Sequence, residues 1–383
     1  MKSAFCFASL LFVLTLSAAE PLYVNEDAWH YWASKSSAAE RQLYGIQPSR
    51  PEFDFSRQGL ERYIDDLARG KLTHFVMNVN TQRSNWPSKS IEPVWASIDD
   101  PKCEQLDWYR RLKELYDRGI DPYKIWIDRC RMKGVKPWIS IRMNDMHGIR
   151  QDNGCTISDF WRAHPEFHLS AEKRSFNNGL DFTRKQVRDR MSAYIRETLD
   201  RYDPDGIELD LIRRYNYLPI GRERDFAPLF TEYMRSLRRL VDAAAKRRGH
   251  PITVAVRLLT KPAHSRDLGM EADVWSKEGI VDVIIPSPYF GDLPQNIPLR
   301  EWREWTGNKA EIVPCADYGL SEPGRAETLR PASWDELCQW AAAMHQQGAR
   351  SLYFFNFHLH PQSGEVWQRL FSEGLESAPR SHP

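Results

Sequence analysis

The sequence predicts an α/β protein that folds as one (β/α)8 barrel with long loops after its strands. Short apolar stretches of strand character mostly alternate with amphipathic helical stretches, which is typical of a parallel sheet. Without residues 1–19, which resemble a leader, 364 of the 383 residues remain, enough for one large barrel. Polar residues follow every predicted strand, where such barrels carry their functional side chains.

The chain begins with a segment that predicts export from the cytoplasm. A basic start at Lys2 precedes an apolar run over residues 4–16, and small residues end at Ala19. This order is that of a secretory signal peptide, and the run is too short to span a bilayer. We therefore expect a signal peptide over 1–19, a single barrel domain over 20–383, no membrane span, and a secreted or periplasmic protein.

Eight strands and eight helices are expected. The helix over 58–69 buries one apolar face, the helix over 122–133 has Pro122 in its first turn, and Ser333 with Glu336 forms a capping box. The strands are expected at 22–27, 72–80, 135–143, within 202–214 after a turn at 203–206, and at 252–258, 281–286, 311–316 and 351–357. The helices are expected at 58–69, 106–118, 122–133, 184–201, 225–248, 268–277, 333–347 and 365–373.

Composition excludes several classes of function. The formal net charge of +1 gives no overall reason to bind nucleic acid. No GxGxxG or phosphate-binding loop supports the alternative fold, an open doubly wound sheet around a nucleotide. The five cysteines after Cys6 show no CxxC pair and no zinc spacing, so we expect mostly buried thiols with room for one disulfide.

The fourth predicted strand carries two acids on one face. Side chains alternate along a strand, so Glu208 and Asp210 share the face opposite Ile207 and Leu209. Burying two carboxylates is costly unless they have partners or a function. Their spacing of about 6.6 Å along the strand places them in one row on the barrel wall.

The ends of all eight strands predict a polar pocket at the barrel mouth. As catalytic candidates we single out Asp210, Glu208 and Asp317. The predicted substrate contacts are Glu26, Asp27, Trp29, Asn78, Asn80, Arg142, Asn144, Asp145, His147, Arg213, Arg257, Tyr289, Asn356 and His358. Among loop tryptophans, Trp29, Trp86 and Trp95 are the ones expected to act as flat platforms for sugar rings.

Such a pocket suits glycoside hydrolysis, which uses two carboxyl groups about 5–5.5 Å apart for retention and about 6.5–9.5 Å apart for inversion. Asp210 is the acid expected to meet the substrate, as nucleophile or base, and Glu208 is expected to support it. The second catalytic carboxyl should come from another strand, where Asp317, Asp145 and Asp27 qualify. We place Asp317 first because it ends a strand across the barrel.

Two other interpretations of the mouth remain open. The acids beside Arg142, Arg213 and Arg257 could form a salt-bridge network that only fills the barrel. The histidines His147, His358 and His360 could hold a metal, but their partners would have to come from distant loops. We expect neither a metal nor another cofactor.

The stretch 205–213 resembles the fourth-strand signature of bacterial secreted glycosyl-hydrolase-like barrel proteins, and 24–27, 75–80 and 142–147 extend this resemblance over most of the chain. It implies a barrel with a sugar-cleaving site. The strand also resembles the DxxDxDxE motif of family 18 chitinases, but the position of their acid holds Ile212. A resemblance to α-amylase-type barrels would make Asp210 the nucleophile, yet their acid position on the fifth strand is not matched.

These observations lead to one leading hypothesis with alternatives. The leading one is a secreted glycoside hydrolase acting on a polysaccharide or oligosaccharide. The three arginines would allow that substrate to be anionic, for example a uronate-containing or sulfated glycan. The alternatives are a glycan-binding barrel without catalysis, and a polysaccharide lyase or esterase.

Overall fold

The computed structural model describes residues 21–27, 31, 55–70, 72–100, 103, 106–147, 149, 156–170, 178–213, 215–288, 294, 296–317, 319–322 and 325–356. The predicted signal peptide and the predicted last helix over 365–373 lie outside these residues. None of the described helices is long and apolar enough to cross a membrane.

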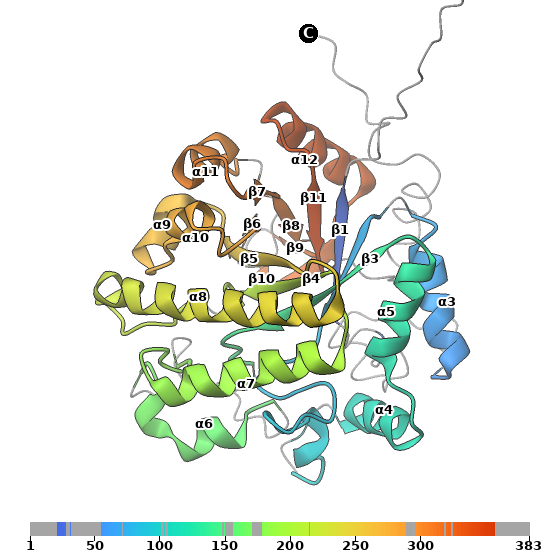
Figure 1. The fold of residues 1–383 in the computed structure, drawn as a ribbon. Coiled ribbons are helices and arrows are strands. Elements are labelled where there is room, and N and C mark those ends of the chain that lie inside the picture. The colour runs from blue at the N-terminus through green and yellow to red at the C-terminus, as the bar shows by residue number, and fades with distance from the viewer. Residues whose placement is uncertain are drawn as a thin grey trace, which may run out of the picture.

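A single parallel sheet forms the centre of the protein (Figure 1). Its strands follow the order β7-β6-β5-β4-β3-β2-β1-β11-β8. Their bounds are β1 Leu22–Glu26, β2 His74–Asn78, β3 Lys136–Arg142, β4 Gly206–Asp210, β5 Thr253–Leu259, β6 Val283–Ser287, β7 Glu311–Ile312, β8 Cys315–Asp317 and β11 Leu352–Phe355.

The sheet closes because β7 and β8 are successive parts of one chain segment. β7 pairs with β6, and β8 pairs with β11. The prediction of one continuous strand over 311–316 is therefore corrected to two short ones. Pro314 lies between them and has no N–H for the ladder, although its carbonyl oxygen accepts from the Tyr353 N–H at 3.0 Å. Eight chain segments thus form the wall of a (β/α)8 barrel.

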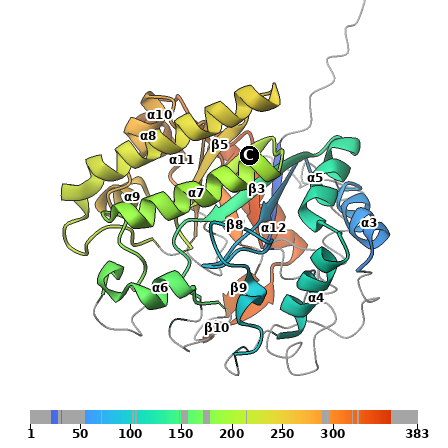
Figure 2. The same ribbon diagram turned by 60° about the horizontal axis from the view of Figure 1, so that its bottom comes forward.

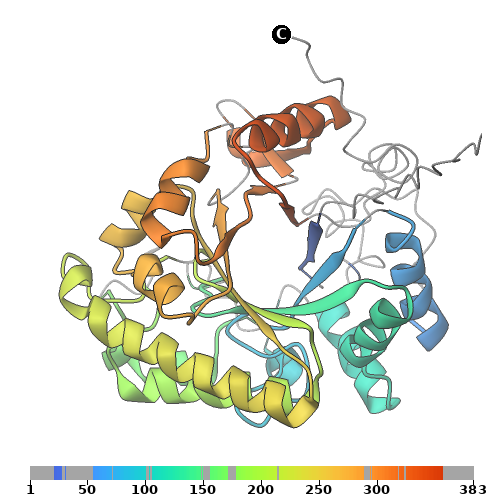
Figure 3. The same ribbon diagram turned by 45° about the horizontal axis from the view of Figure 1, so that its top comes forward.

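Helices surround the strands as an outer ring (Figures 1 and 3). The longest described helix is α8 Glu223–Arg248, in which Glu223 and Asp225 lie in the first turn and Gly249 ends the helix at a φ of 79°. The others are α3 Arg57–Leu67, α4 Leu106–Asp117, α5 Pro122–Met132, α6 Asp159–Ala163, α7 Lys185–Arg201, α9 Pro262–Asp267, α10 Ala272–Lys277, α11 Leu299–Thr306 and α12 Trp334–Gln346, with 3-10 turns η2 Val94–Ser97 and η3 Pro165–Phe167.

The long loops carry structure of their own at one end of the barrel. The hairpin of β9 Gly319–Glu322 and β10 Arg325–Pro331 follows β8. Figure 2 shows this hairpin at the same end of the molecule as α6 and α4, which follow β3 and β2. This is the carboxyl end of the strands, where the sequence places the mouth.

Two helical regions differ from the sequence prediction. The helix expected over 268–277 is α10 alone and starts at Ala272, because Gly269 before it has a φ of 78°. Helix α9, which ends before Gly269, was not predicted. Helix α11 and the β9–β10 hairpin were not predicted.

Two apolar layers hold the barrel together. The larger one packs the outward strand residues, such as Ile207 and Leu209, against the helices. A smaller cluster fills the lumen, with Tyr23 and His74 stacked at 3.9 Å and Trp138 edge-on to both rings. The predicted alternation of β4 is therefore confirmed, and Glu208 and Asp210 face the lumen above this aromatic base.

The described cysteines include both buried thiols and a disulfide, as predicted. Cys103 forms a disulfide, while Cys130 and Cys315 are buried thiols whose pKa values are raised by burial.

Candidate active site

Asp210 ends β4 and is fixed by three donors. Its Oδ1 accepts from the backbone N–H groups of Ile212 and Arg213, both at 3.1 Å. Its Oδ2 accepts from Arg257 at 2.6 Å, and both partners of this ion pair are almost completely buried. The turn after β4 and the neighbouring strand β5 therefore set the position and orientation of this carboxylate.

Glu208 lies one inward step deeper and contacts neutral groups. Its Oε1 accepts from the Ser140 hydroxyl of β3 at 2.8 Å, and its Oε2 accepts from the Tyr353 hydroxyl of β11 at 2.5 Å. Burial raises the pKa of Glu208 and the charge of Asp210 adds to this, although Arg257 and the two hydroxyl donors oppose it. Glu208 is therefore the acid at this site that is biased toward its protonated form.

Arg257 connects the acids of β4 to the opposite wall. Its guanidinium lies 3.7 Å from the ring centroid of Phe355 and donates to the Ser287 hydroxyl at 3.2 Å. Ser287 in turn donates to the Cys315 sulfur at 3.2 Å. Burial lowers the pKa of Arg257, but Asp210 and Glu208 outweigh burial and raise it, so the arginine stays charged.

A second chain of polar groups runs from β1 to the loop after β3. Arg142 donates to Asp27 at 2.5 Å and to Asp145 at 3.2 Å, and Asp145 contacts the Nδ1 atom of His147 at 2.8 Å. Because the guanidinium of Arg213 can only donate, its 2.8 Å contact makes Nε2 of His147 the acceptor. This is the arrangement of a neutral imidazole with its proton on Nδ1.

The pKa shifts of this chain agree with its contacts. Burial raises the pKa of Asp145, but His147 and Arg142 outweigh burial and bring it well below its usual range. Burial and the Arg213 cation lower the pKa of His147 against the opposing effect of Asp145. Burial and the neighbouring Arg142 lower the pKa of Arg213 to about 10.

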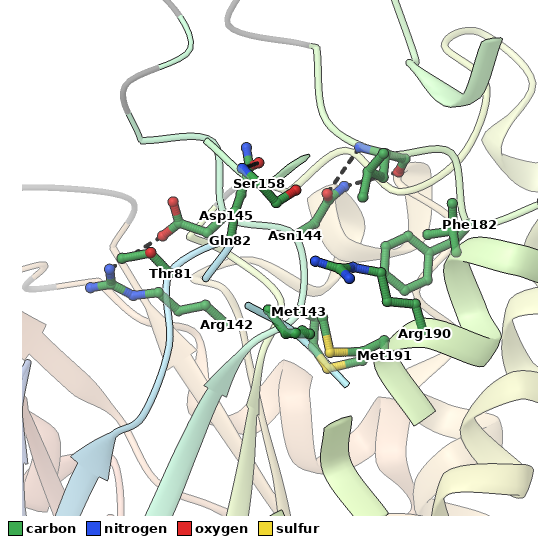
Figure 4. Close-up of a pocket in the computed structure, with 13 residues that line it drawn as sticks. Thr81, Gln82, Arg142, Met143, Asn144, Asp145, Ser158, Phe182, Arg190 and Met191 are labelled. Carbon is green, nitrogen blue, oxygen red and sulfur yellow. Dashed lines mark hydrogen bonds and ion pairs between the residues drawn. The ribbon is translucent and has the colours of Figure 1, made fainter. Parts of the chain in front are cut away.

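Figure 4 shows Arg142 and Asp145 beside a small cavity next to the mouth. The other wall of the cavity comes from α7 and contains Val187 and Met191. The cavity is therefore largely an apolar recess behind the polar chain.

Asp317 and Asn356 end the two strands on the far side of the barrel. Asp317 is buried and follows Cys315 on the inward face of β8. Asn356 comes directly after β11 in the left-handed region, with a φ of 53°, a conformation that asparagine tolerates better than most residues.

Three residues predicted to contact substrate form hydrogen bonds within the protein. Glu26 follows the inward Asn25 on β1, so its side chain lies on the outer face of the strand. There the Tyr63 hydroxyl of α3 donates to it at 2.5 Å. Asn80 joins β2 to β3 by exchanging hydrogen bonds with the backbone of Arg142. Asn144 binds the backbone of Leu180 and Asn216 and so holds two loops together. The substrate contacts of these three residues stay predictions, and the hydrogen bonds show what else each residue does in the fold.

Other predicted contacts have different outcomes. Trp29, Tyr289 and His358 lie outside the described residues, and so does His360. Trp86 is a core residue that stacks on Tyr194, with ring centroids 5.6 Å apart, so its expected role as a platform is wrong. Trp95 is partly buried and packs against Tyr116.

Sequence reasoning missed three lumen residues. Ser140 and Tyr353 supply the donors to Glu208, and Asn25 is buried on the inward face of β1. Two of them could have been found from the alternation of side chains along a strand, because Asn25 shares a face with Tyr23 and Ser140 shares a face with Arg142.

The arrangement offers acid–base and nucleophilic chemistry from carboxyl groups. Among the residues described, no group of three or more His, Cys, Asp and Glu side chains could hold a metal ion. The arginines predicted to grip a substrate anion are instead ion-paired to Asp27, Asp145 and Asp210, except Arg213, which contacts His147.

Comparisons with known proteins find similarity in structure but not in sequence. No protein-family model matches the chain, and no curated protein sequence matches it. α-L-Fucosidase isoenzyme 2 from Paenibacillus thiaminolyticus has a TM-score of 0.55 and 14% identity, over 93% of this chain and 49% of the fucosidase. The PgaB (BpsB) glycoside hydrolase domain from Bordetella bronchiseptica has a TM-score of 0.54 and 10% identity, over 92% of this chain and 98% of the domain.

The chain therefore spans about half the length of the fucosidase but nearly all of the Bordetella domain. At these identities the comparisons establish the fold. The protein has the α/β barrel fold found in these glycoside hydrolases.

Proposed function

We propose that the protein is a glycoside hydrolase that cleaves a polysaccharide or oligosaccharide at the carboxyl end of its barrel. The observation that carries this proposal is the fixed, buried carboxylate of Asp210, one step above a second buried acid, Glu208, in the lumen. The fold neighbours named glycoside hydrolases support it by analogy only.

Each acid has a proposed role. Asp210 acts as nucleophile or base, because three donors orient it and Arg257 balances its charge. Glu208 supports Asp210 from below, as the acid whose pKa is raised by burial and by the charge of Asp210. Asp317, from the far side of the barrel, supplies the second carboxyl group.

The contacts favour a substrate without a negative charge at the mouth. Arg142 and Arg257 donate to carboxylates, so an anionic glycan would have to displace these internal partners. An anionic glycan would also meet the carboxylates of Asp27 and Asp210, which face the same lumen. We therefore place an uncharged sugar ahead of the anionic alternative.

Asp210→Asn tests the proposal on a panel of neutral and anionic glycans, with reducing ends measured. We expect it to lower kcat by about 10²–10⁴-fold. Asp317→Asn should lower the rate as well. The matched control is Asp205→Asn, at the other end of the same strand, where Asp205 pairs with Arg131 at 2.8 Å. Hydrolysis that survives in Asp210→Asn, or the absence of any cleaved glycan, rejects the hydrolase.

The second candidate is a glycan-binding barrel, in which the paired acids and arginines only fill the lumen. The ion pairs of Arg142 with Asp27 and of Arg257 with Asp210 favour this candidate, because they give the acids a structural role. Glycans that bind without being cleaved would support it. A new ultraviolet absorption from a double bond in the product would instead indicate a lyase.

We also propose that the protein is exported. The leader-like segment and the disulfide of Cys103 support this, because disulfides persist in oxidising compartments. Mass spectrometry of the protein from the periplasm or medium should find Glu20 as its first residue. A protein retained in the cytoplasm with Met1 intact would contradict the proposal.

A further inference from the structure

Two asparagines in the lumen have carboxamide groups without hydrogen-bond partners. Asn25 on β1 is 1% exposed, and Asn78 on β2 is 3% exposed. Neither the oxygen nor the nitrogen of either side chain has a hydrogen-bond partner among the residues that the structure describes. A buried carboxamide in this state costs free energy, because it has lost water without gaining a partner.

Both side chains lie on the inward face of their strands. Asn25 alternates with Val24, which packs in the outer layer, and shares its face with Tyr23 of the lumen cluster. Asn78 shares its face with Val76 of the same cluster. The unpaired groups are therefore aimed into the barrel rather than at the helices.

The polar groups of the candidate active site surround them. Asn78 is the register partner of Ser140, whose hydroxyl donates to Glu208. Asp27, two residues after Asn25, accepts a hydrogen bond from Arg142. The acids have partners of their own, so within this part of the lumen the two carboxamides stand out as unsatisfied.

We propose that Asn25 and Asn78 bind hydroxyl groups of an uncharged sugar ring in the deepest part of the active site. This inference rests on the proposed function, and it names the substrate class at that site. A carboxamide offers two N–H donors and one acceptor oxygen, and a sugar hydroxyl both donates and accepts. Two such groups on neighbouring strands suit neighbouring hydroxyls of one ring.

Charge argues against an anion in the same place. A carboxylate or sulfate would lie near the carboxylate of Asp27, and the nearby Arg142 already donates to two acids. A neutral hydroxyl avoids this repulsion and satisfies the carboxamides. Because an analogue that lacks one hydroxyl would leave a buried carboxamide unpaired, the site should reject it strongly.

The competing explanation is structural, with the carboxamides satisfied by ordered water. The two explanations predict opposite effects of leucine, which has a similar size but no polar atoms. If water-mediated bonds stabilise the barrel, Asn25→Leu and Asn78→Leu should lower Tm. If the groups are kept for a ligand, removing them should leave Tm unchanged or raise it, while sugar affinity falls.

The experiment measures binding of glucose, galactose, mannose, fucose, xylose and N-acetylglucosamine to the full chain by calorimetry, with single-deoxy analogues of any sugar that binds. We expect Asn25→Leu and Asn78→Leu to weaken binding of the parent sugar at least about tenfold, a change of about 1.4 kcal/mol. At least one deoxy analogue should bind the matching variant and the wild type equally. Tm should not fall.

Asn85→Leu is the matched control. Asn85 is also buried and its Oδ1 is also unpaired, but it lies in the loop after β2, where its N–H binds the Val79 carbonyl at 2.9 Å. Its substitution should leave sugar affinity unchanged. Where a leucine variant does not fold, the alanine variant replaces it under the same criteria.

Three results would overturn the inference: wild-type affinity in both variants, a lowered Tm with unchanged affinity, or no sugar bound by the wild type. Cleavage of a glycan through Asp210 with normal binding by both variants would leave the hydrolase standing and reject only the subsite. Sugar binding that depends on Asn25 and Asn78 in a protein that cleaves nothing would reject the hydrolase and keep the subsite.

Discussion

At the scale of single residues, the lumen depends on close packing beneath the acids. Gly206 begins β4 and faces the indole of Trp138 on β3, its register partner. A Cβ atom added at Gly206 would lie 2.3 Å from Cε2 of Trp138, closer than two carbon atoms can pack. The glycine therefore gives the tryptophan its space in the aromatic base, and Glu208 and Asp210 are positioned above that base.

We expect Gly206→Ala to lower the free energy of unfolding by about 1–3 kcal/mol, because overpacking forces side chains and backbone to shift. Urea denaturation measures this loss. The double variant Gly206→Ala with Trp138→Phe should lose less than the sum of the two single changes, since the smaller ring makes room. Strict additivity would show that the two residues do not compete for space.

The residue scale also shows where sequence reasoning ends. Alternation was sufficient to place Glu208 and Asp210 on one inward face, because the rule is local. It could not assign their partners, since Arg257 is 47 residues from Asp210 and Tyr353 is 145 residues from Glu208. The arginines were therefore predicted as grips for a substrate anion, whereas burial required most of them to pair with acids inside the protein.

At the scale of elements, local signals predicted boundaries well where they were strong. The capping box of Ser333 and Glu336 is present at the start of α12, and Asp121 caps α5 ahead of Pro122. Both signals act through hydrogen bonds within one turn of the helix, so no distant residue is needed to form them. This explains why these starts match the structure.

Weak or conflicting local signals gave the errors. Helix α11 has apolar residues three apart at Leu299, Trp302 and Trp305, but it spans only eight residues, which is short for a periodic pattern to be recognised. The hairpin of β9 and β10 surrounds a Pro323-Gly324 pair, a turn signal that was available in the sequence. Pro314 interrupts a stretch that otherwise has the composition of one strand. The pairing of β7 with β6 and of β8 with β11 shows that the two parts together fill one strand position of the barrel.

At the scale of the whole molecule, Glu208 connects distant parts of the chain through the lumen. Ser140 on β3 and Tyr353 on β11 both donate to it, so strands near the middle and the end of the chain meet at one carboxyl group. A carboxyl group in this environment weakens the fold when it ionises, because burial and Asp210 raise its pKa. Such a cost is typical of groups retained for function rather than stability.

This argument predicts how Glu208→Gln changes stability with pH. Because the pKa of Glu208 is raised in the folded state, the unfolded chain releases its proton first as pH rises above about 4.5, which weakens the wild-type fold. Glutamine does not ionise, so the free energy of unfolding of the variant should rise relative to that of the wild type by up to about 1.4 kcal/mol per pH unit. The rise ends where Glu208 also ionises in the folded wild type. Urea denaturation at several values between pH 3 and 8 measures the difference in the free energy of unfolding.

Glu197→Gln provides a control of opposite sign. Burial of Glu197 is outweighed by hydrogen bonds from Ser88, Lys89 and Ser90, which lower its pKa. Its contribution to stability is present above the unfolded pKa and lost as pH falls through the folded one, so this variant should fall behind the wild type as pH rises toward about 4.5 and stay level above that. If Glu208→Gln instead lost stability with rising pH as Glu197→Gln does, Glu208 would be a charged partner of Arg257 that stabilises the fold, and the proposal that it is held toward its protonated form would be wrong.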